Sequence, residues 1–315
     1  MIQELAREYP VSVVCRQLEM SRSSYYDWFK KREEREKKAT EKGLLFHHIE
    51  RIFQSKRQTY GYRRIFRQLC EEKILCYENQ VKQLMKEKQL HVKRRGKFIH
   101  TTDSNHASPI SPNWLNQDFK AFRPNQKWVG DITYLGTSEG YLYLAVVMDL
   151  YSRKVIGWSL QSHLRGELIS DALQKAIQER SRMLSFQQRR QLGDRTSPSD
   201  SMLLFHSDRG CQYASQEYRL LLQRQHILSS MSRKGNCYDN AAMESFFHTL
   251  KQECTDHLDK PTKEELKSAI FEYLEVFYNR SRMHSTLNYV SPVHFELSYL
   301  EKEKQLLEES LVNGV

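Results

Sequence analysis

The sequence predicts a mixed α/β domain preceded by a series of short helices, and three observations support this. Apolar residues recur at helical spacing over most of residues 10–90. From residue 127 onward the period becomes that of strands, in runs separated by polar or glycine-containing turns. Strands and helices then alternate as far as residue 254. With 315 residues and 39% hydrophobic content, the chain suffices for one substantial core and one or two small satellites.

Residues 1–42 are expected to hold two short helices and a linker helix. The two helices, 11–18 and 22–30, are separated by a three-residue break in which Ser21 is a good N-cap. This outline is that of a helix-turn-helix unit, although an ordinary helical hairpin fits equally well. The charge-dense tract 30–42 is expected to be an exposed helix.

Residues 43–95 carry the charge excess of the chain. Residues 51–100 contain 14 Lys and Arg against 4 Asp and Glu, a net +10 that equals the charge of the whole protein. Three short helices with a basic outer face, the last capped by Asn79, favour a second DNA-binding unit over a merely solvated surface. The candidate DNA contacts here are Arg63, Arg64, Arg67, Lys82 and Lys86, followed by Lys93, Arg94 and Arg95 just before a linker over 96–121.

The sheet-forming part is expected to begin with a three-stranded meander. The expected strands are 127–135, 141–150, 154–160, 202–207 and 227–231, and the expected helices are 167–190, 217–225, 240–254 and 263–279. Asp239 or Asn240 is expected to cap helix 240–254. The loop before that helix forms a flexible basic lip in which Arg233 and Lys234 are further candidate DNA contacts.

Composition excludes several classes of protein. The six cysteines include no CxxC pair and no zinc-finger spacing, so they are expected to be reduced and mostly buried. No stretch is long and apolar enough to cross a membrane, and the N-terminus lacks the apolar core of a signal peptide. A soluble, cytoplasmic and nucleoid-associated protein with a polyanionic partner is therefore expected.

Three carboxylates are the candidate catalytic centre. Asp208 and Glu244 stand with 35 residues between them, and Asp131 lies upstream. The spacing alone carries no weight, but each Asp lies at or near the end of an apolar strand-like run and the Glu lies on a helix, so a compact fold can bring them together. Three carboxylates suit Mg²⁺ or Mn²⁺, and two such ions together promote phosphodiester chemistry.

Other polar residues near these carboxylates have simpler interpretations. Lys251 shares a helix face with Glu244 and could contact a phosphate of a DNA end, or be a surface lysine. His206 is expected to make a structural hydrogen bond at a strand end, and Asp149 to sit in a turn. Trp128 and Tyr134 are expected to be core aromatics.

Motifs spread over nearly the whole chain resemble a known family. They are Tyr60–Ile65, Trp128–Tyr134, His206–Tyr213, Ser232–Ala241, Glu244–Phe247, Tyr278–Arg280, His284–Leu287 and Ser291–Pro292. Together they are similar to those of OrfB-type transposases of a large bacterial insertion-sequence group, whose catalytic domain is related to retroviral integrase. The resemblance implies an RNase H-like catalytic domain over 122–285 and a helical extension over 286–315.

The resemblance also implies roles for residues and partners. Asp131, Asp208 and Glu244 would form a DDE triad that binds divalent metal, and Lys251 would bind the transposon end. Such enzymes bind terminal inverted repeats, release a 3′-hydroxyl, and use it to attack target DNA, usually as homo-oligomers. Many members act as fusions with a product of an upstream frame; the chain shows no sustained heptad zipper and no N-terminal His/Cys zinc module.

Two other functions remain open from the sequence. A hydrolytic nuclease of the same fold would cleave DNA without joining it. A DNA-binding regulator or transposition inhibitor would use the core only as a scaffold, although the intact triad argues against this.

Overall fold

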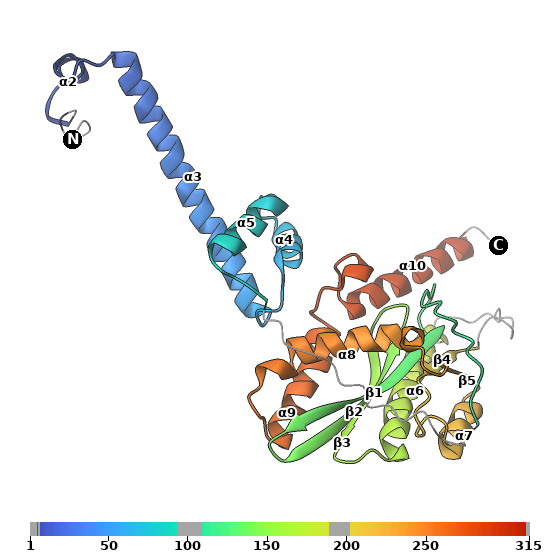
Figure 1. The fold of residues 1–315 in the computed structure, drawn as a ribbon. Coiled ribbons are helices and arrows are strands. Elements are labelled where there is room, and N and C mark those ends of the chain that lie inside the picture. Colours follow the sequence, from blue (N-terminus) through green and yellow to red (C-terminus); the bar gives the residue numbers. More distant parts are fainter. Residues whose placement is uncertain (1–4, 6, 93–108, 189–201, 313–315) are drawn as a thin grey trace. The chain divides into compact units, whose positions relative to one another are not determined.

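The computed structural model describes residues 5, 7–92, 109–188 and 202–312 (Figure 1). The chain divides into two compact units, Met1–Val92 and Lys93–Val315. The expected cluster Lys93, Arg94 and Arg95 and part of the expected linker lie outside the described residues. The boundary expected at residue 42 falls inside a continuous helix, and the domain limits otherwise stay predictions.

The first unit is built from helices α2 to α5. Helix α2 (Val11–Gln17) and the 34-residue helix α3 (Arg22–Ser55) are followed by α4 (Tyr62–Glu71) and α5 (Glu78–Glu87). Ser21 caps α3 as expected, because its hydroxyl accepts a hydrogen bond from the N–H of Ser24 at 3.0 Å. Asn79 was the wrong cap for α5: Tyr77 occupies that position, and the Gln80 side chain accepts from its N–H.

The end of α3, α4 and α5 share one apolar core. Its fully buried members are Ile49, Ile52, Phe53, Ile65, Leu69, Val81, Leu84 and Met85. They come from apolar positions at helical spacing, which is why the sequence revealed these helices. The basic side chains are left on the outer faces.

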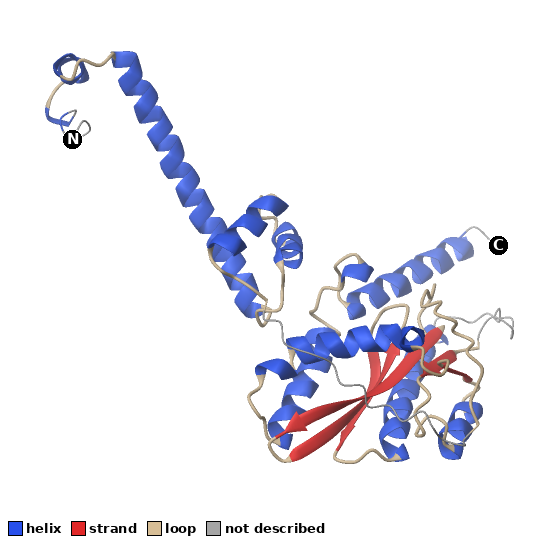
Figure 2. Cartoon of the chain, viewed as in Figure 1, coloured by secondary structure: helices blue, strands red, loops and turns tan. Residues whose placement is uncertain are grey.

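The second unit contains a five-stranded sheet of order β3-β2-β1-β4-β5 (Figure 2). The strands are β1 (Lys127–Thr137), β2 (Gly140–Asp149), β3 (Val155–Gln161), β4 (Leu204–Ser207) and β5 (Leu228–Met231). The first three form the expected antiparallel meander. β4 pairs in parallel with β1, and β5 pairs in parallel with β4. This arrangement confirms the mixed α/β prediction and the RNase H-like core.

Helices cover both faces of this sheet (Figures 1 and 2). Helix α6 (Gly166–Gln188) packs on β2 and β3, and α7 (Gln216–Arg224) packs beside it and on β5. Gly157 on β3 permits the close approach of α6, because a side chain there would collide with the backbone of Ala172 and Ala176. Helix α8 (Ala241–Glu253) packs against β1.

The C-terminal segments attach to the strands. Helix α9 (Lys263–Phe271) continues into a π-helical segment, η3 (Glu272–Tyr278), where one uninterrupted α-helix was expected. The Asn279 side chain then bonds the backbone of Val155 on β3 through both its oxygen and its nitrogen. Helix α10 (Pro292–Val312) follows, and its Glu296 pairs with Lys154 at 3.2 Å. Short 3-10 turns lie at Cys237–Asn240, Thr255–His257 and Ser285–Leu287.

Two expectations about side-chain burial need correction. Cys15 and Cys254 are buried, but Cys70 and Cys211 are exposed, because neither falls on the apolar face of its segment. Trp128 is fully buried, whereas Tyr134 is half-buried and contacts Tyr143 edge to face, near the end of the sheet.

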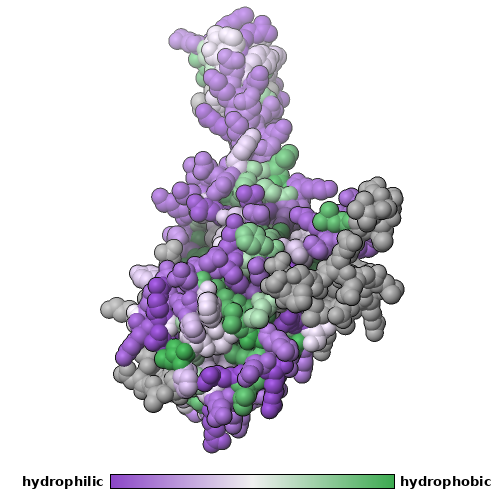
Figure 3. All heavy atoms as spheres, turned by 90° about the vertical axis from the view of Figure 1, so that its right-hand side faces the viewer, coloured by the Kyte–Doolittle hydropathy of each residue, from purple (hydrophilic) through white to green (hydrophobic). Residues whose placement is uncertain are grey.

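Hydrophilic side chains dominate the surface drawn in Figure 3, and hydrophobic ones form small separate patches. Among the described residues, no helix has the length and apolar character needed to cross a membrane. The cytoplasmic location stays a prediction.

Candidate active site

The parallel pairing of β1 with β4 sets Asp131 beside Asp208. Val129 is level with His206 and Gly130 with Ser207, so Asp131 is level with the residue at which β4 has just ended. Neighbouring strands lie about 4.8 Å apart. Asp131 was expected near a strand end; it lies inside β1, which runs six residues further, and only β4 stops at this level.

Helix α8 brings Glu244 to the same region. Its Met243, Phe246, Phe247 and Leu250 are buried, as the sequence predicted, so the helix has a fixed rotation on the sheet. That rotation leaves Glu244 half-buried, and its charge acts on Asp131 of β1. The three candidate carboxylates therefore come from a strand interior, a strand end and a helix.

The electrostatics of Asp131 show that the three groups interact. Burial of Asp131 and the negative charges of Asp208 and Glu244 raise the pKa of its carboxyl well above the usual range. A hydrogen bond from the Ile132 N–H and the charge of Lys251 act in the opposite direction but do not compensate. Negative charge thus accumulates here, which is a favourable setting for a cation.

Backbone groups hold two of the carboxylates. The Ile132 N–H donates to Asp131 Oδ1 at 2.7 Å, and the Gly210 N–H donates to Asp208 Oδ1 at 3.0 Å. A side chain at position 210 would lie 3.1 Å from that same oxygen, so glycine leaves the Asp208 carboxylate room. Nowhere in the described part of the chain are three His, Cys, Asp or Glu side chains already arranged to hold a metal ion.

Lys251 lies two turns after Glu244 on the same helix and is half-buried. Burial lowers the pKa of its ammonium group, while Asp256 and Asp131 raise it. The electrostatic influence of Asp131 is consistent with a position beside the carboxylates, as the sequence suggested.

His206 and Asp149 have the structural roles predicted for them. His206 is fully buried, its Nδ1 is 2.8 Å from Ser230 Oγ and its Nε2 is 3.1 Å from Ser232 Oγ. Burial lowers the pKa of His206 to about 4. Asp149 accepts hydrogen bonds from the backbone N–H groups of Asn125, Tyr151 and Ser152 in the turn after β2.

Asp239 has a role that the sequence did not reveal. It is fully buried and accepts hydrogen bonds from the side chains of Asn113, Gln117 and Arg233 and from the Arg233 N–H. Of the two expected caps of α8, Asn240 holds the N-cap position, without a side-chain cap bond, and Asp239 does not cap the helix. Asp239 instead ties the segment before β1 to the loop before α8, and only a tertiary contact with residues 113 and 117 could show this.

The candidate DNA contacts differ in their surroundings. In the first unit Arg63 and Lys82 lie over the Tyr62 ring and Arg64 over the Tyr60 ring, while Arg67 and Lys86 are exposed. In the second, Lys234 is exposed and the Arg233 guanidinium pairs with Asp239 at 2.8 Å. The basic loop is therefore anchored at Arg233 rather than free along its length.

Models of known protein families match three segments of the chain. Residues 121–237 match the model described as integrase core domain, and residues 244–300 match a second model of that description. Residues 40–98 match the HTH-like domain.

Curated relatives match along nearly their whole length. An uncharacterized 31 kDa protein of insertion element IS600 from Shigella sonnei is 40% identical over 286 residues, which is 91% of this chain and 98% of that protein. Transposase InsF for insertion sequence IS3A from Escherichia coli (strain K12) is 37% identical over 299 residues, 94% of this chain and 96% of InsF. Among solved structures, the HTLV-2 integrase catalytic core domain in complex with magnesium (trimeric form) is 17% identical with a TM-score of 0.37, covering 56% of this chain and 99% of that one.

Proposed function

Because this chain belongs to the IS3-family transposases, we propose that it cleaves DNA at the ends of its insertion sequence and joins the released 3′ ends to target DNA. One observation carries the proposal. Asp131, Asp208 and Glu244 come from β1, the end of β4 and α8, and their charges influence one another. Convergent carboxylates on rigid elements are what metal-dependent phosphodiester chemistry requires.

We propose Mg²⁺, with Mn²⁺ as a substitute, as the metal, and two ions as the number. The residues present fit these ions, since hard cations take carboxylate oxygens and Asp131 stands among negative charges that a cation would neutralise. The three carboxylates would have to move closer together to bind the ion, because no group of three His, Cys, Asp or Glu among the described residues is already arranged to hold a metal. When bound, the ions supply charge stabilisation and an activated water or hydroxyl.

The chain's own residues would orient these ligands and the DNA. The Ile132 and Gly210 N–H groups fix one oxygen each of Asp131 and Asp208, which limits how those carboxylates turn. Lys251, half-buried beside them, would bind a phosphate of the transposon end. The Arg233–Asp239 pair would hold the loop before α8 so that the exposed Lys234 faces the phosphate backbone of the DNA.

We propose that the first unit binds the terminal inverted repeats. The HTH-like match and the basic faces of α4 and α5 support this. A homo-oligomer on DNA and a partner from an upstream frame remain predictions that follow from the family resemblance.

The test uses labelled terminal-repeat DNA, Mg²⁺ and the full chain, with any upstream-frame partner supplied. Cleavage with joined products supports the transposase, cleavage alone supports a nuclease, and binding alone supports a regulator. Asp208→Asn should reduce cleavage by roughly 10³-fold or more while DNA binding persists, since several kcal/mol of metal-dependent stabilisation are lost. The exposed Asp259→Asn is the matched control, and equal cleavage by the two variants would refute the metal-site assignment.

A further inference from the structure

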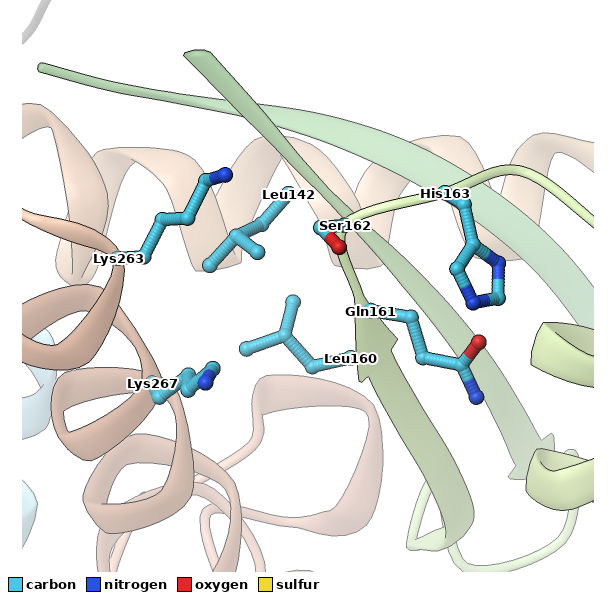
Figure 4. A pocket seen from close by; sticks show the side chains of 7 residues that line it. All are labelled: Leu142, Leu160, Gln161, Ser162, His163, Lys263 and Lys267. Carbon is cyan, nitrogen blue, oxygen red and sulfur yellow. The ribbon is translucent and has the colours of Figure 1, made fainter. Parts of the chain in front are cut away.

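A groove opens between α9 and the end of β3 in the second unit (Figure 4). Its cavity has a volume of about 310 Å³. Leu142 and Leu160 form an apolar floor, Ser162 lies between the walls, and Lys263 and Lys267 of α9 line one side. We call this feature the lysine groove.

The lysine groove lies on the same face of the sheet as Asp131. Leu142 pairs with Leu135, and side chains of paired residues point to the same face. Leu135 is four residues after Asp131 on β1, an even number, so these two also share a face. Four residues of a strand span roughly 14 Å, which is the distance from the candidate active site to the groove floor along the strand.

The charge of the lysine groove is positive but moderated by nearby acids. Lys263 and Lys267 are four residues apart and so project from one side of α9. Lys267 stands 3.5 Å from Glu264, whose side chain is 82% exposed, and such exposed pairs bind weakly. The Glu139 carboxylate accepts a hydrogen bond from the backbone N–H of Lys263 at 2.7 Å and adds negative charge beside this lysine.

Gln161 and His163 lie at the edge of the lysine groove. In the described structure, the buried Nδ1 of His163 and the buried Oε1 of Gln161 have no hydrogen-bond partner. His163 Nε2 lies 3.9 Å from Glu167. Gln161 pairs with Tyr143 across the sheet, and its Nε2 donates to Asp171 of α6 at 2.7 Å, so its side chain projects to the face opposite Leu142 and Asp131.

We propose that the lysine groove binds the sugar-phosphate backbone of duplex DNA that extends from the active site. Two ammonium groups match phosphates, and Leu160, the partly exposed member of the floor, matches the apolar side of deoxyribose. For a duplex that lies along β1, roughly 14 Å at 3.4 Å per base pair places this contact about four base pairs from the cleaved bond. The contact is independent of base sequence. The inference rests on the proposed function, since it takes DNA as the substrate of the neighbouring carboxylates.

The first experiment measures DNA binding by the full chain as a function of salt. Each phosphate contact contributes about 0.9 to the slope of log K against log salt, so Lys263→Gln with Lys267→Gln should lower the slope by about two. The control pair Lys302→Gln with Lys304→Gln removes the same charge from the exposed surface of α10 and should leave the slope unchanged. We call the Lys263→Gln, Lys267→Gln double variant the groove pair. Equal slopes for the groove pair and the wild type would overturn the proposal.

The second experiment locates the contact on the DNA. Ethylation of single phosphates should weaken wild-type binding near four base pairs from the cleavage site, and this interference should vanish in the groove pair. Interference that persists in the groove pair would overturn the proposal. A third outcome would also overturn it: inorganic phosphate stabilises the wild type against heat but not the groove pair, while the salt slope of DNA binding is the same for both. That outcome would identify a small-anion site.

These binding readouts do not depend on cleavage. A lowered slope in a protein that never cleaves DNA would keep the lysine groove and refute the proposed function. If the groove pair had an unchanged slope while cleavage depended on Asp208, the proposed function would stand and the lysine groove would be refuted.

Discussion

The two units handle charge in opposite ways. In the first unit the cations stand on outer helix faces above a wholly apolar core, and Thr59 is the only buried polar side chain among its described residues. In the second, polar and charged side chains are buried throughout, including Asp149, His206, Asp239 and the pair Glu253–Arg282. A surface that attracts phosphates needs only exposed charge, whereas ligands held for chemistry need a rigid, fully hydrogen-bonded frame.

This difference predicts that charge changes affect stability strongly in the second unit and weakly in the first. Three of the four predictions below test it by changing charge and one compares packing at a glycine in each unit; they run from the largest expected effect to the smallest.

Breaking the buried ion pair should have the largest effect. Arg282 donates to both carboxylate oxygens of Glu253, and the Tyr273 hydroxyl adds a third hydrogen bond. Glu253→Ala should lower the free energy of unfolding by about 3–5 kcal/mol, because a buried guanidinium loses its partner. Denaturant unfolding measures this. The exposed pair Arg63–Glu78, broken by Glu78→Ala, should cost under about 1 kcal/mol, and similar losses for both would contradict the comparison.

Asp149 should make the second unit depend on pH. Burial raises the pKa of its carboxyl from 3.8 to about 6, against the hydrogen bonds it accepts, so the folded chain holds this proton more tightly than the unfolded chain. Its favourable contribution is therefore complete below pH 4 and is lost as the pH rises through about 6. The shift corresponds to about 3 kcal/mol.

Comparing wild type with Asp149→Asn by denaturant unfolding isolates this contribution. The stability of the wild type relative to the variant should fall between pH 3.5 and pH 7 by about 3 kcal/mol. A constant difference across that range would show that Asp149 does not hold the proton.

Two glycines should respond with opposite signs. A methyl group at Gly157 meets the backbone of α6, so Gly157→Ala should destabilise by about 1–3 kcal/mol. Gly43 lies exposed within α3 with nothing near its missing side chain, so Gly43→Ala should stabilise by about 0.5–1 kcal/mol. Thermal unfolding of both variants checks the signs; a stabilised Gly157→Ala would mean that α6 can shift.

Replacing Arg63, Arg64 and Arg67 with Gln should change stability least. The free energy of unfolding should move by about 0.5 kcal/mol or less per site, while the salt slope of DNA binding falls by about three. Replacing Lys30, Lys37 and Lys38 of α3 removes the same charge and serves as the control. An unchanged slope in the arginine variant would reject its phosphate contacts.

The helices and strands were largely predictable because their boundaries depend on local periodicity. The expected strand 127–135 became β1 over Lys127–Thr137, and the expected helix 240–254 became α8 over Ala241–Glu253. The π-helical segment Glu272–Tyr278 was not predictable, because the same residue types occur in α-helices and in π-helices. The grouping of Asp131, Asp208 and Glu244 was anticipated from their setting and from family motifs.

The sequence by itself determined the apolar periods, the meander, the basic first unit and the three candidate carboxylates, since each depends on residue type and local spacing. Tertiary structure decided the rest. Only the parallel register sets the interior of β1 level with the end of β4, and only packing from residues 113 and 117 turns Asp239 from an expected cap into a buried acceptor. Such contacts join residues 77 to 126 positions apart, and no local pattern encodes which buried donor meets which acceptor.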